Sequence, residues 1–272
     1  MKRVLIVGNS HAGAIKLGWD MLAAQAAERV EVHFFVAPSP IFRRLGAVGS
    51  VFGELPGGDL VDEERAFLIR INGDTAVELE AFDEILLVGM FWAGTNEVLP
   101  ILNSFTVDGL YEISRPQRLT QQAFRDMLLG AFRAAAFDPV WTSLRRPKLT
   151  LLLRPMPIEL VRSLRVDQIV RKNRWASAKV EYDRMRPVLE IQKRMAHDFY
   201  SEHGIALMHQ PEDTILPSGL TKDKYCRDRV ESLTKPGSKI DIGHMNADFG
   251  RFCMTEYLDR IAPTAGSDAQ IG

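Results

Sequence analysis

Five short apolar runs, rich in β-branched and aromatic side chains, recur along the chain. They cover residues 3–7, 30–36, 84–88, 149–153 and 205–209. Because each run is continuous rather than alternating with polar residues, it predicts a strand buried on both faces, as in a parallel sheet.

Apolar positions with helical spacing lie between several of these runs. They predict helices over residues 11–28, 118–136 and 177–203, and the segment that follows His244 is helix-like again. Strands that alternate with helices are typical of a doubly wound fold. The sequence therefore predicts an α/β protein with three layers, α/β/α, around a five-stranded parallel sheet, similar in type to flavodoxin.

Two segments depart from this alternation. Residues 62–80 contain two alternating arms around Asn72-Gly73, which predicts a β-hairpin insertion between the second and third strands. Residues 37–60 are rich in glycine and proline and predict a long loop, which is either a binding loop or an exposed linker. We expect a single domain over residues 1–262 and a disordered tail over residues 263–272.

The first strand ends in the turn Gly-Asn-Ser-His, which allows three interpretations. A phosphate loop would need Lys and Ser or Thr where the chain has Ala14 and Ile15, so the phosphates would lack their lysine. A dinucleotide fingerprint would need glycine at Ser10 and a carboxylate after the second strand, and both are missing. The third interpretation, a turn that presents Ser10 as a nucleophile, loses no required residue at the turn.

A serine nucleophile needs a base, and the base usually needs an acidic partner that fixes its tautomer. Asp241 and His244 near the C-terminus offer such a pair, and Gly243 allows a tight turn between them. The competing interpretation is that Ser10 only caps the helix that begins at His11. The Asp-x-x-His pair, combined with the serine turn, favours the nucleophile.

The motifs Gly8-Asn9-Ser10-His11 and Asp241-Ile242-Gly243-His244 together resemble the SGNH/GDSL hydrolases, which also have this order of strands and helices. The resemblance rests on short motifs at both ends of the chain and implies an SGNH hydrolase type of fold. It implies Ser10 as the nucleophile, His244 as the general base and then acid, and Asp241 as the residue that orients His244.

The resemblance also implies an oxyanion hole, where this chain departs from the family pattern. Gly89 matches the family glycine after the third strand, but Phe91 stands at the family asparagine position, and Asn96 is the nearest replacement. A second glycine donor would follow the second strand; Gly46, Gly49 and Gly53 are the candidates, of which we take Gly49. The Ser10 backbone N–H would be the remaining donor.

Five further residues are expected to contact substrate. Four of them lie in the turns after the first and third strands: Asn9, His11, Phe91 and Trp92. The fifth, Arg154, follows the fourth strand and is expected at the same edge of the sheet, although a salt-bridged loop arginine is the alternative. The pattern of the remaining histidines matches no metal site, and a serine mechanism requires no cofactor.

Composition limits the partners. The 272 residues contain 34 basic and 35 acidic side chains, so net charge gives no sign of a nucleic-acid partner. There is no apolar run of about 18 residues that would span a membrane. Two cysteines without metal-like spacing, and an N-terminal apolar run too short for a signal sequence, lead us to expect a cytoplasmic protein.

Basic residues concentrate in one part of the chain. Residues 145–186 hold twelve Lys or Arg against four acidic residues. This excess is compatible with an anionic substrate, such as an acidic glycan or a phosphate-bearing acyl donor, but a solvated helix face or an oligomer contact is the preferred interpretation.

The sequence thus predicts a serine esterase that acts on an O-acylated small molecule or carbohydrate. An acyltransferase using the same three residues is the first alternative. A catalytically silent domain that binds a glycan or a protein is the second, because Phe91 replaces the family asparagine. A flavodoxin-like phosphate-binding module is the third.

Overall fold

The computed structural model describes eight stretches of the chain, namely residues 1–26, 28–90, 98–114, 117–134, 140–164, 168–169, 180–228 and 239–263. Contacts divide the chain into two compact units. The first contains residues 1–89, 138–152 and 247–272, and the second contains residues 90–137 and 153–246. The expectation of one domain over residues 1–262 stays a prediction. The predicted tail lies outside the described residues from position 264 onward.

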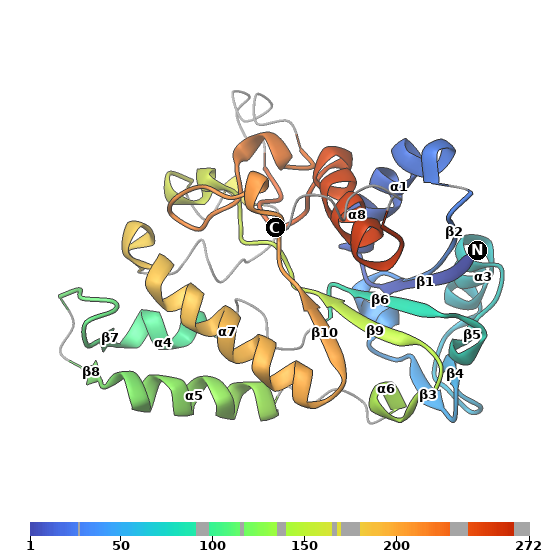
Figure 1. Cartoon of the computed structure of the whole chain (residues 1–272), viewed down its shortest axis with the longest axis horizontal. Helices are drawn as coiled ribbons and strands as arrows, with labels where there is room; N and C mark the ends of the chain where they lie inside the picture. The colour runs from blue at the N-terminus through green and yellow to red at the C-terminus, as the bar shows by residue number, and fades with distance from the viewer. Residues whose placement is uncertain are drawn as a thin grey trace. The chain divides into compact units, whose positions relative to one another are not determined.

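A five-stranded parallel sheet with flanking helices confirms the predicted fold class (Figure 1). Its strand order is β10-β9-β6-β1-β2. The strands are β1 (Lys2–Gly8), β2 (Val30–Val36), β6 (Glu84–Val88), β9 (Lys148–Leu152) and β10 (Ile205–Met208). Each overlaps one of the five apolar runs. The central strand β6 is buried at every position, as a strand covered on both faces requires, whereas the edge strands β2 and β10 are only partly buried.

The register brings the carboxyl ends of three strands together in the first unit. Gly8 at the end of β1 pairs with Val36 of β2 on one side and Val88 of β6 on the other. A Cβ atom on Gly8 would lie 2.6 Å from the Val88 carbonyl oxygen, so only glycine fits there. The turn that carries Ser10 therefore starts from a closely packed point of the sheet.

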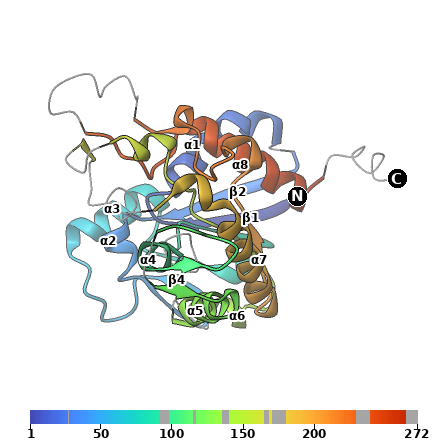
Figure 2. The ribbon, with the colours of Figure 1, turned by 90° about the vertical axis from the view of Figure 1, so that its left-hand side faces the viewer.

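Helices α1 (Ala12–Ala26) and α8 (Ala247–Ile261) pack along each other in the first unit (Figures 1 and 2). Two glycines allow their backbones to touch. A Cβ on Gly18 would lie 2.1 Å from the Gly250 carbonyl carbon, and a Cβ on Gly250 would lie 1.7 Å from the Ala14 carbonyl oxygen. Any larger residue at either position would force the helices apart.

Residues 62–80 do not form the predicted hairpin. Residues Asp62–Asn72 form helix α3, followed by the short strand β5 (Ala76–Glu78). The first turn of α3 holds three acidic residues, and the Glu64 carboxylate accepts a hydrogen bond from the Val61 N–H, which favours a helix start. Gly73, at φ 85°, ends the helix in the left-handed conformation. Asn-Gly is thus a helix end here rather than a hairpin turn.

The predicted long loop over residues 37–60 also has regular structure. It contains a short helix α2 (Ser39–Phe42) and an antiparallel hairpin of β3 (Gly46–Val48) and β4 (Val51–Gly53), and β5 pairs with β4. Phe52 on β4 anchors the hairpin by packing against Phe35, Phe42 and Trp141, the last of which lies on α6 (Val140–Ser143). The antiparallel insertion exists, but it lies upstream of its predicted position.

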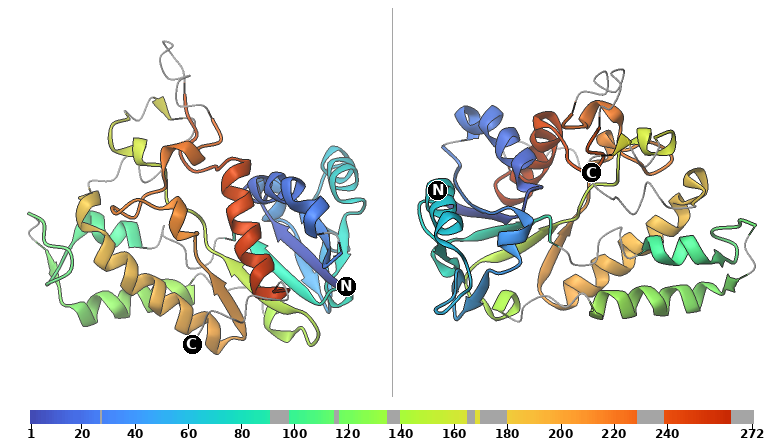
Figure 3. Two further views of the ribbon diagram at one scale, coloured as in Figure 1. Left: turned by 45° about the horizontal axis from the view of Figure 1, so that its top comes forward. Right: turned by 180° about the vertical axis from the view of Figure 1, so that it is seen from behind.

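The second unit contains α4 (Val98–Ser104), β7 (Thr106–Val107), β8 (Arg118–Leu119), α5 (Gln121–Ala134) and α7 (Arg186–Glu202) with strand β10. Helices α5 and α7 lie side by side, with Phe132 against Phe199 (Figure 3). Helix α7 starts later than predicted because Pro187 fits its first turn. Short 3-10 turns connect these elements, namely η2 (Glu159–Arg162), η4 (Tyr182–Arg184), η5 (Glu212–Thr214) and η6 (Asp223–Tyr225).

No helix in the described ranges is long and apolar enough to cross a membrane.

The glycine contact between α1 and α8 predicts an unusual effect of alanine. Gly250→Ala should lower the free energy of unfolding by roughly 1–3 kcal/mol, because the new methyl group collides with the backbone of α1. The matched control is Gly130→Ala in α5, where a Cβ would meet no atom within 4 Å. This change should raise the free energy of unfolding by up to about 1 kcal/mol through helix propensity. Urea unfolding measures both, and equal effects at the two positions would refute the contact.

Candidate active site

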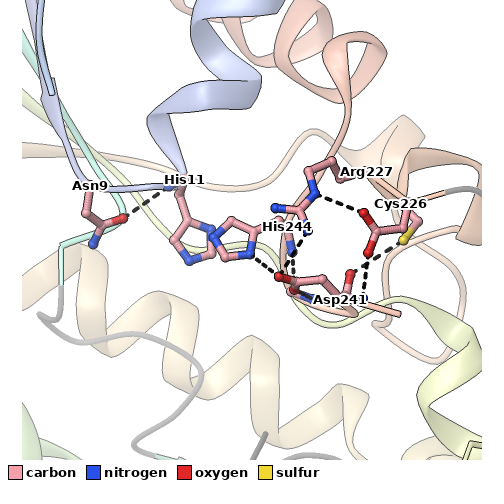
Figure 4. A network of polar contacts seen from close by, with 8 residues as sticks. Asn9, His11, Cys226, Arg227, Asp241 and His244 are labelled. Atoms are coloured by element: carbon pink, nitrogen blue, oxygen red, sulfur yellow. Dashed lines mark hydrogen bonds and ion pairs between the residues drawn. The ribbon is translucent and has the colours of Figure 1, made fainter. Parts of the chain in front are cut away.

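Asn9 braces the turn that follows β1. Its side chain is 1% exposed, and its Nδ2 donates a hydrogen bond to the Gly89 carbonyl oxygen at the end of β6. Its Oδ1 accepts from the His11 backbone N–H at 3.1 Å (Figure 4). Both ends of the amide are therefore engaged within the first unit. The predicted contact of Asn9 with substrate stays a prediction.

Gly89 completes this turn because no other residue fits beside Asn9. Its φ is 69°, and a Cβ there would lie 2.3 Å from the Asn9 Oδ1 and 3.0 Å from the His11 Cβ. The end of β6 and the turn after β1 thus form one closely packed unit. The part of Gly89 in an oxyanion hole stays a prediction.

Ser10 lies exposed between β1 and α1, two residues before the helix begins. The Ala12 N–H donates to the Asn9 carbonyl oxygen at 2.9 Å, which fixes a tight turn around Ser10. His11, the next residue, is half-buried. A short rigid turn at the carboxyl end of a parallel strand is a suitable place for a nucleophile.

The predicted pair of Asp241 and His244 forms in the second unit. The Asp241 Oδ2 lies 2.7 Å from the His244 Nδ1, and each side chain is 12% exposed. The other carboxylate oxygen, Oδ1, accepts hydrogen bonds from the backbone N–H groups of Gly243 and His244, at 3.1 and 3.2 Å. Because an ionised carboxylate only accepts hydrogen bonds, Nδ1 carries a proton, and in the neutral form of this imidazole the lone pair is on Nε2.

Residues 226–228 also contact the Asp241–His244 turn (Figure 4). The Asp228 Oδ2 accepts from the Asp241 N–H at 2.8 Å, and the Arg227 N–H donates to the His244 carbonyl oxygen at 2.9 Å. The Arg227 guanidinium also lies 3.5 Å from the Asp241 carboxylate. The sequence alone gives no signal for the roles of Arg227 and Asp228, because no motif connects an Arg-Asp pair to a turn more than ten positions later.

The environment of Asp241 keeps its carboxyl group ionised. Burial is the largest single influence and raises the pKa, but several opposing influences together outweigh it. They are the hydrogen bond from His244, the positive charge that His244 carries when its ring is protonated, the Gly243 N–H and the Arg227 guanidinium. The resulting pKa of Asp241 lies far below its ordinary value, so the carboxylate is charged near neutral pH.

Cys226 is the other potential nucleophile beside the pair. Its Sγ donates to the Asp241 carbonyl oxygen at 3.5 Å. Burial is the main cause that raises the pKa of its thiol to about 11. Because the thiolate is the reactive form, Cys226 is inert near neutral pH.

The remaining site candidates fall in several places. Arg154 is half-buried just after β9, in the second unit. Gly49, at φ 60°, is the exposed turn of the β3–β4 hairpin, while Gly46 and Gly53 pair with each other in its strands. Phe91, Trp92 and Asn96 lie outside the described residues. Because Ser10 belongs to the first unit and Asp241 and His244 to the second, their pairing stays a prediction.

Several members of the basic segment are engaged with acids. Arg146 pairs with Asp83 at 3.0 Å, and Arg162 pairs with Glu159 at 2.6 Å and also with Asp183. These contacts lie at the surface, where ion pairs contribute little to stability. Among the described residues, no group of three or more His, Cys, Asp or Glu is arranged to hold a metal ion.

The chain matches no protein-family model and no curated protein. Among solved structures, the periplasmic domain of the lipopolysaccharide acetyltransferase of Salmonella ser. Paratyphi A is similar at a TM-score of 0.43 and 12% sequence identity. The match covers 96% of this chain and 83% of that chain. A TM-score and an identity this low say nothing about the activity of this chain.

The low pKa of Asp241 predicts how its contribution to stability depends on pH. A carboxyl group whose folded pKa is depressed stabilises the fold fully above its unfolded pKa, about 3.9 for Asp, and loses this effect as pH falls through the folded pKa. Asp241→Asn should therefore lower the urea midpoint at about pH 5, with the gap closing as pH falls below about 4.

Asp213→Asn is the matched control for this experiment, because Asp213 is exposed in the same unit. It should change the midpoint little at any pH. A gap between the Asp241→Asn variant and the unmodified protein that persists unchanged at pH 3 would contradict an ionised, stabilising carboxylate.

Proposed function

We propose that this protein is a serine-dependent enzyme that cleaves acyl esters, with Ser10, His244 and Asp241 as nucleophile, base and orienting acid. The observation that carries the proposal is the 2.7 Å contact between the Asp241 Oδ2 and the His244 Nδ1. It fixes the imidazole tautomer that a general base needs, and it has the Asp-x-x-His spacing of the SGNH/GDSL hydrolases.

The chemistry runs in two steps. In the first, the Ser10 Oγ attacks the acyl carbon while the His244 Nε2 takes the serine proton. The tetrahedral intermediate collapses when His244 returns that proton to the leaving alcohol, which leaves an acyl group on Ser10. In the second, water attacks the acyl-enzyme while His244 takes its proton. The bond between the acyl carbon and the Ser10 Oγ then breaks as His244 returns the proton to that oxygen, which releases the carboxylic acid and restores Ser10.

Two features of the first unit support a role for the turn around Ser10. Its backbone is fixed by the buried Asn9 amide and by the glycine-only position Gly89, so Ser10 is held on a rigid support. Helix α1, which begins just after Ser10, packs along α8, which begins three residues after His244. The Ser10 N–H, Gly89, Gly49 and Asn96 are the proposed oxyanion donors.

The proposed substrate is an O-acylated small molecule or carbohydrate, a class that rests on the family resemblance. An acceptor hydroxyl in place of water would make the same residues an acyltransferase. Substrate contacts are proposed for Asn9, His11, Phe91, Trp92 and Arg154. No cofactor takes part in this scheme, and a cytoplasmic location stays a prediction.

Covalent labelling tests the nucleophile. A fluorophosphonate probe should modify Ser10, and Ser10→Ala should abolish both the labelling and all but a trace of p-nitrophenyl acetate hydrolysis, a loss on the order of 10³-fold or more. Ser201→Ala is the control, because Ser201 lies exposed at the end of α7, and it should react like the unmodified protein. Intact-protein mass spectrometry and peptide mapping locate the adduct.

The same experiment judges the silent-domain alternative, which the replacement of the family asparagine by Phe91 favours. A folded protein that shows neither labelling nor hydrolysis would overturn the enzyme proposal and support a binding domain. Labelling at a serine other than Ser10 would overturn the assignment of the nucleophile.

Removing the orienting carboxylate tests the Asp241–His244 pair kinetically. Asp241→Asn should lower kcat by a factor on the order of 10⁴ with little change in KM, because the amide can stabilise the wrong imidazole tautomer. Asp213→Asn should keep the full rate. A kcat within a few-fold of the unmodified protein in the Asp241→Asn variant would show that Asp241 is not the residue that orients the catalytic base.

A further inference from the structure

A cavity of about 30 Å³ lies inside the second unit. It is walled by helix α7, which packs on β10, and by the residues that follow β9 and β10 (Figure 1). Its apolar wall includes Leu153, Met156, Leu189 and Ile215. Because a water molecule needs about 10–15 Å³ by this measure, the cavity has room for a group of a few heavy atoms. None of the lining residues is Ser10, Asp241 or His244.

Gln192 on α7 contributes an unsatisfied amide to this wall. The residue is 1% exposed, and neither its Oε1 nor its Nε2 has a hydrogen-bond partner in the described part of the chain. A buried polar group left without partners costs about 1–3 kcal/mol. Native proteins rarely keep such a group unless a water or a ligand satisfies it.

The second glutamine of the wall shows what a purely structural amide looks like here. The Gln210 Oε1 accepts from the Met156 N–H at 3.1 Å, and its Nε2 donates to the hydroxyls of Thr214 and Thr221 at 3.0 and 2.9 Å. Both polar atoms of the Gln210 amide therefore have hydrogen-bond partners inside the protein. The contrast indicates that Gln192 is placed for a molecule that enters the cavity.

Charge at the cavity favours an anion. The described lining residues include the cations Arg154, Arg186 and Lys193 and the single carboxylate Glu190. Glu190 and Lys193 pair at 3.3 Å, and Glu212 lies 3.6 Å from Lys193 and 3.7 Å from Arg186. Counting Glu212 as well, the cations still exceed the carboxylates. The Lys193 side chain is 24% exposed, so its charge is only partly screened by solvent.

We propose that this cavity binds a small aliphatic carboxylate, or the carboxylate end of a larger molecule. The apolar wall takes the short carbon chain, the Gln192 Nε2 donates to the carboxylate, and Lys193 and Arg186 supply the opposite charge. Inorganic phosphate shares the charge but has no aliphatic part, so it fits the apolar wall less well. The inference does not depend on Ser10 chemistry.

Calorimetric titration of the full chain with propionate, propionamide and inorganic phosphate tests the ligand class. Propionate should bind and raise the melting temperature, propionamide should do neither, and phosphate should bind at least several-fold more weakly than propionate. Equal binding of propionate and propionamide would overturn the role of charge. Tighter binding of phosphate, or no binding of propionate, would overturn the carboxylate assignment.

Two substitutions with matched controls locate the site. Gln192→Met keeps the side-chain length, and it should weaken propionate binding about ten- to hundredfold, the worth of a hydrogen bond to a charged group. Its control is Gln122→Met on α5, where the exposed amide donates to Asp126 at 2.9 Å. Lys193→Met should also weaken binding, whereas Lys148→Met, an exposed change outside the cavity, should not.

The stability of the ligand-free variants separates binding from folding. Gln192→Met removes an unsatisfied buried amide, so the ligand-free protein should unfold at the same or a higher urea concentration. A stabilised Gln192→Met variant that still binds propionate normally would show that Gln192 is only an uncompensated core residue, and would overturn the proposal. Ser10→Ala should bind propionate as the unmodified protein does, which keeps this result independent of the proposed enzyme activity.

Discussion

The contact between Gly18 and Gly250 is the constraint on which the first unit depends. A helix backbone can lie against another backbone only where both lack side chains, and here a single methyl group at Gly250 would lie 1.7 Å from a carbonyl oxygen. Helix α1 follows the serine turn and α8 follows the Asp241–His244 turn, so both motifs continue directly into this crossing.

The two halves of the candidate site are stabilised by different physical means. Close packing stabilises the serine turn, because Asn9 is buried and because any Cβ at Gly8 or Gly89 would collide with a neighbour. The Asp241–His244 turn is held by charge, since one carboxylate accepts two backbone N–H groups and the imidazole while Arg227 lies beside it. The closely packed serine turn therefore tolerates almost no substitution at its glycines. The stability of the charged Asp241–His244 turn instead depends on pH and changes even with conservative substitutions.

The sequence predicted the features that depend on local composition. Short continuous apolar runs rich in β-branched residues favour strands of a parallel sheet, and all five strands were found in this way, including the partly buried edge strands β2 and β10. The Asp241–His244 contact was also predicted, because a three-residue spacing with a glycine limits the geometry. Asn72-Gly73 was misassigned because a left-handed glycine ends a helix as well as a hairpin, and the acidic residues before Phe67 were the deciding signal. Arg227 and Gln192 could not be predicted, since their roles arise only from tertiary contacts.

Two buried polar side chains of the second unit, Asp241 and Gln192, differ in whether the protein satisfies their hydrogen bonds. Asp241 carries a full charge and is surrounded by donors, which outweigh the cost of its burial. Gln192 carries no charge, yet its amide has no partner among the described residues, although the neighbouring Gln210 shows that the same fold can satisfy such a group completely. Leaving the Gln192 amide unsatisfied costs free energy, and the satisfied amide of Gln210 shows that the fold does not require this cost. A function that uses the Gln192 amide, such as the binding of a small molecule, accounts for that cost.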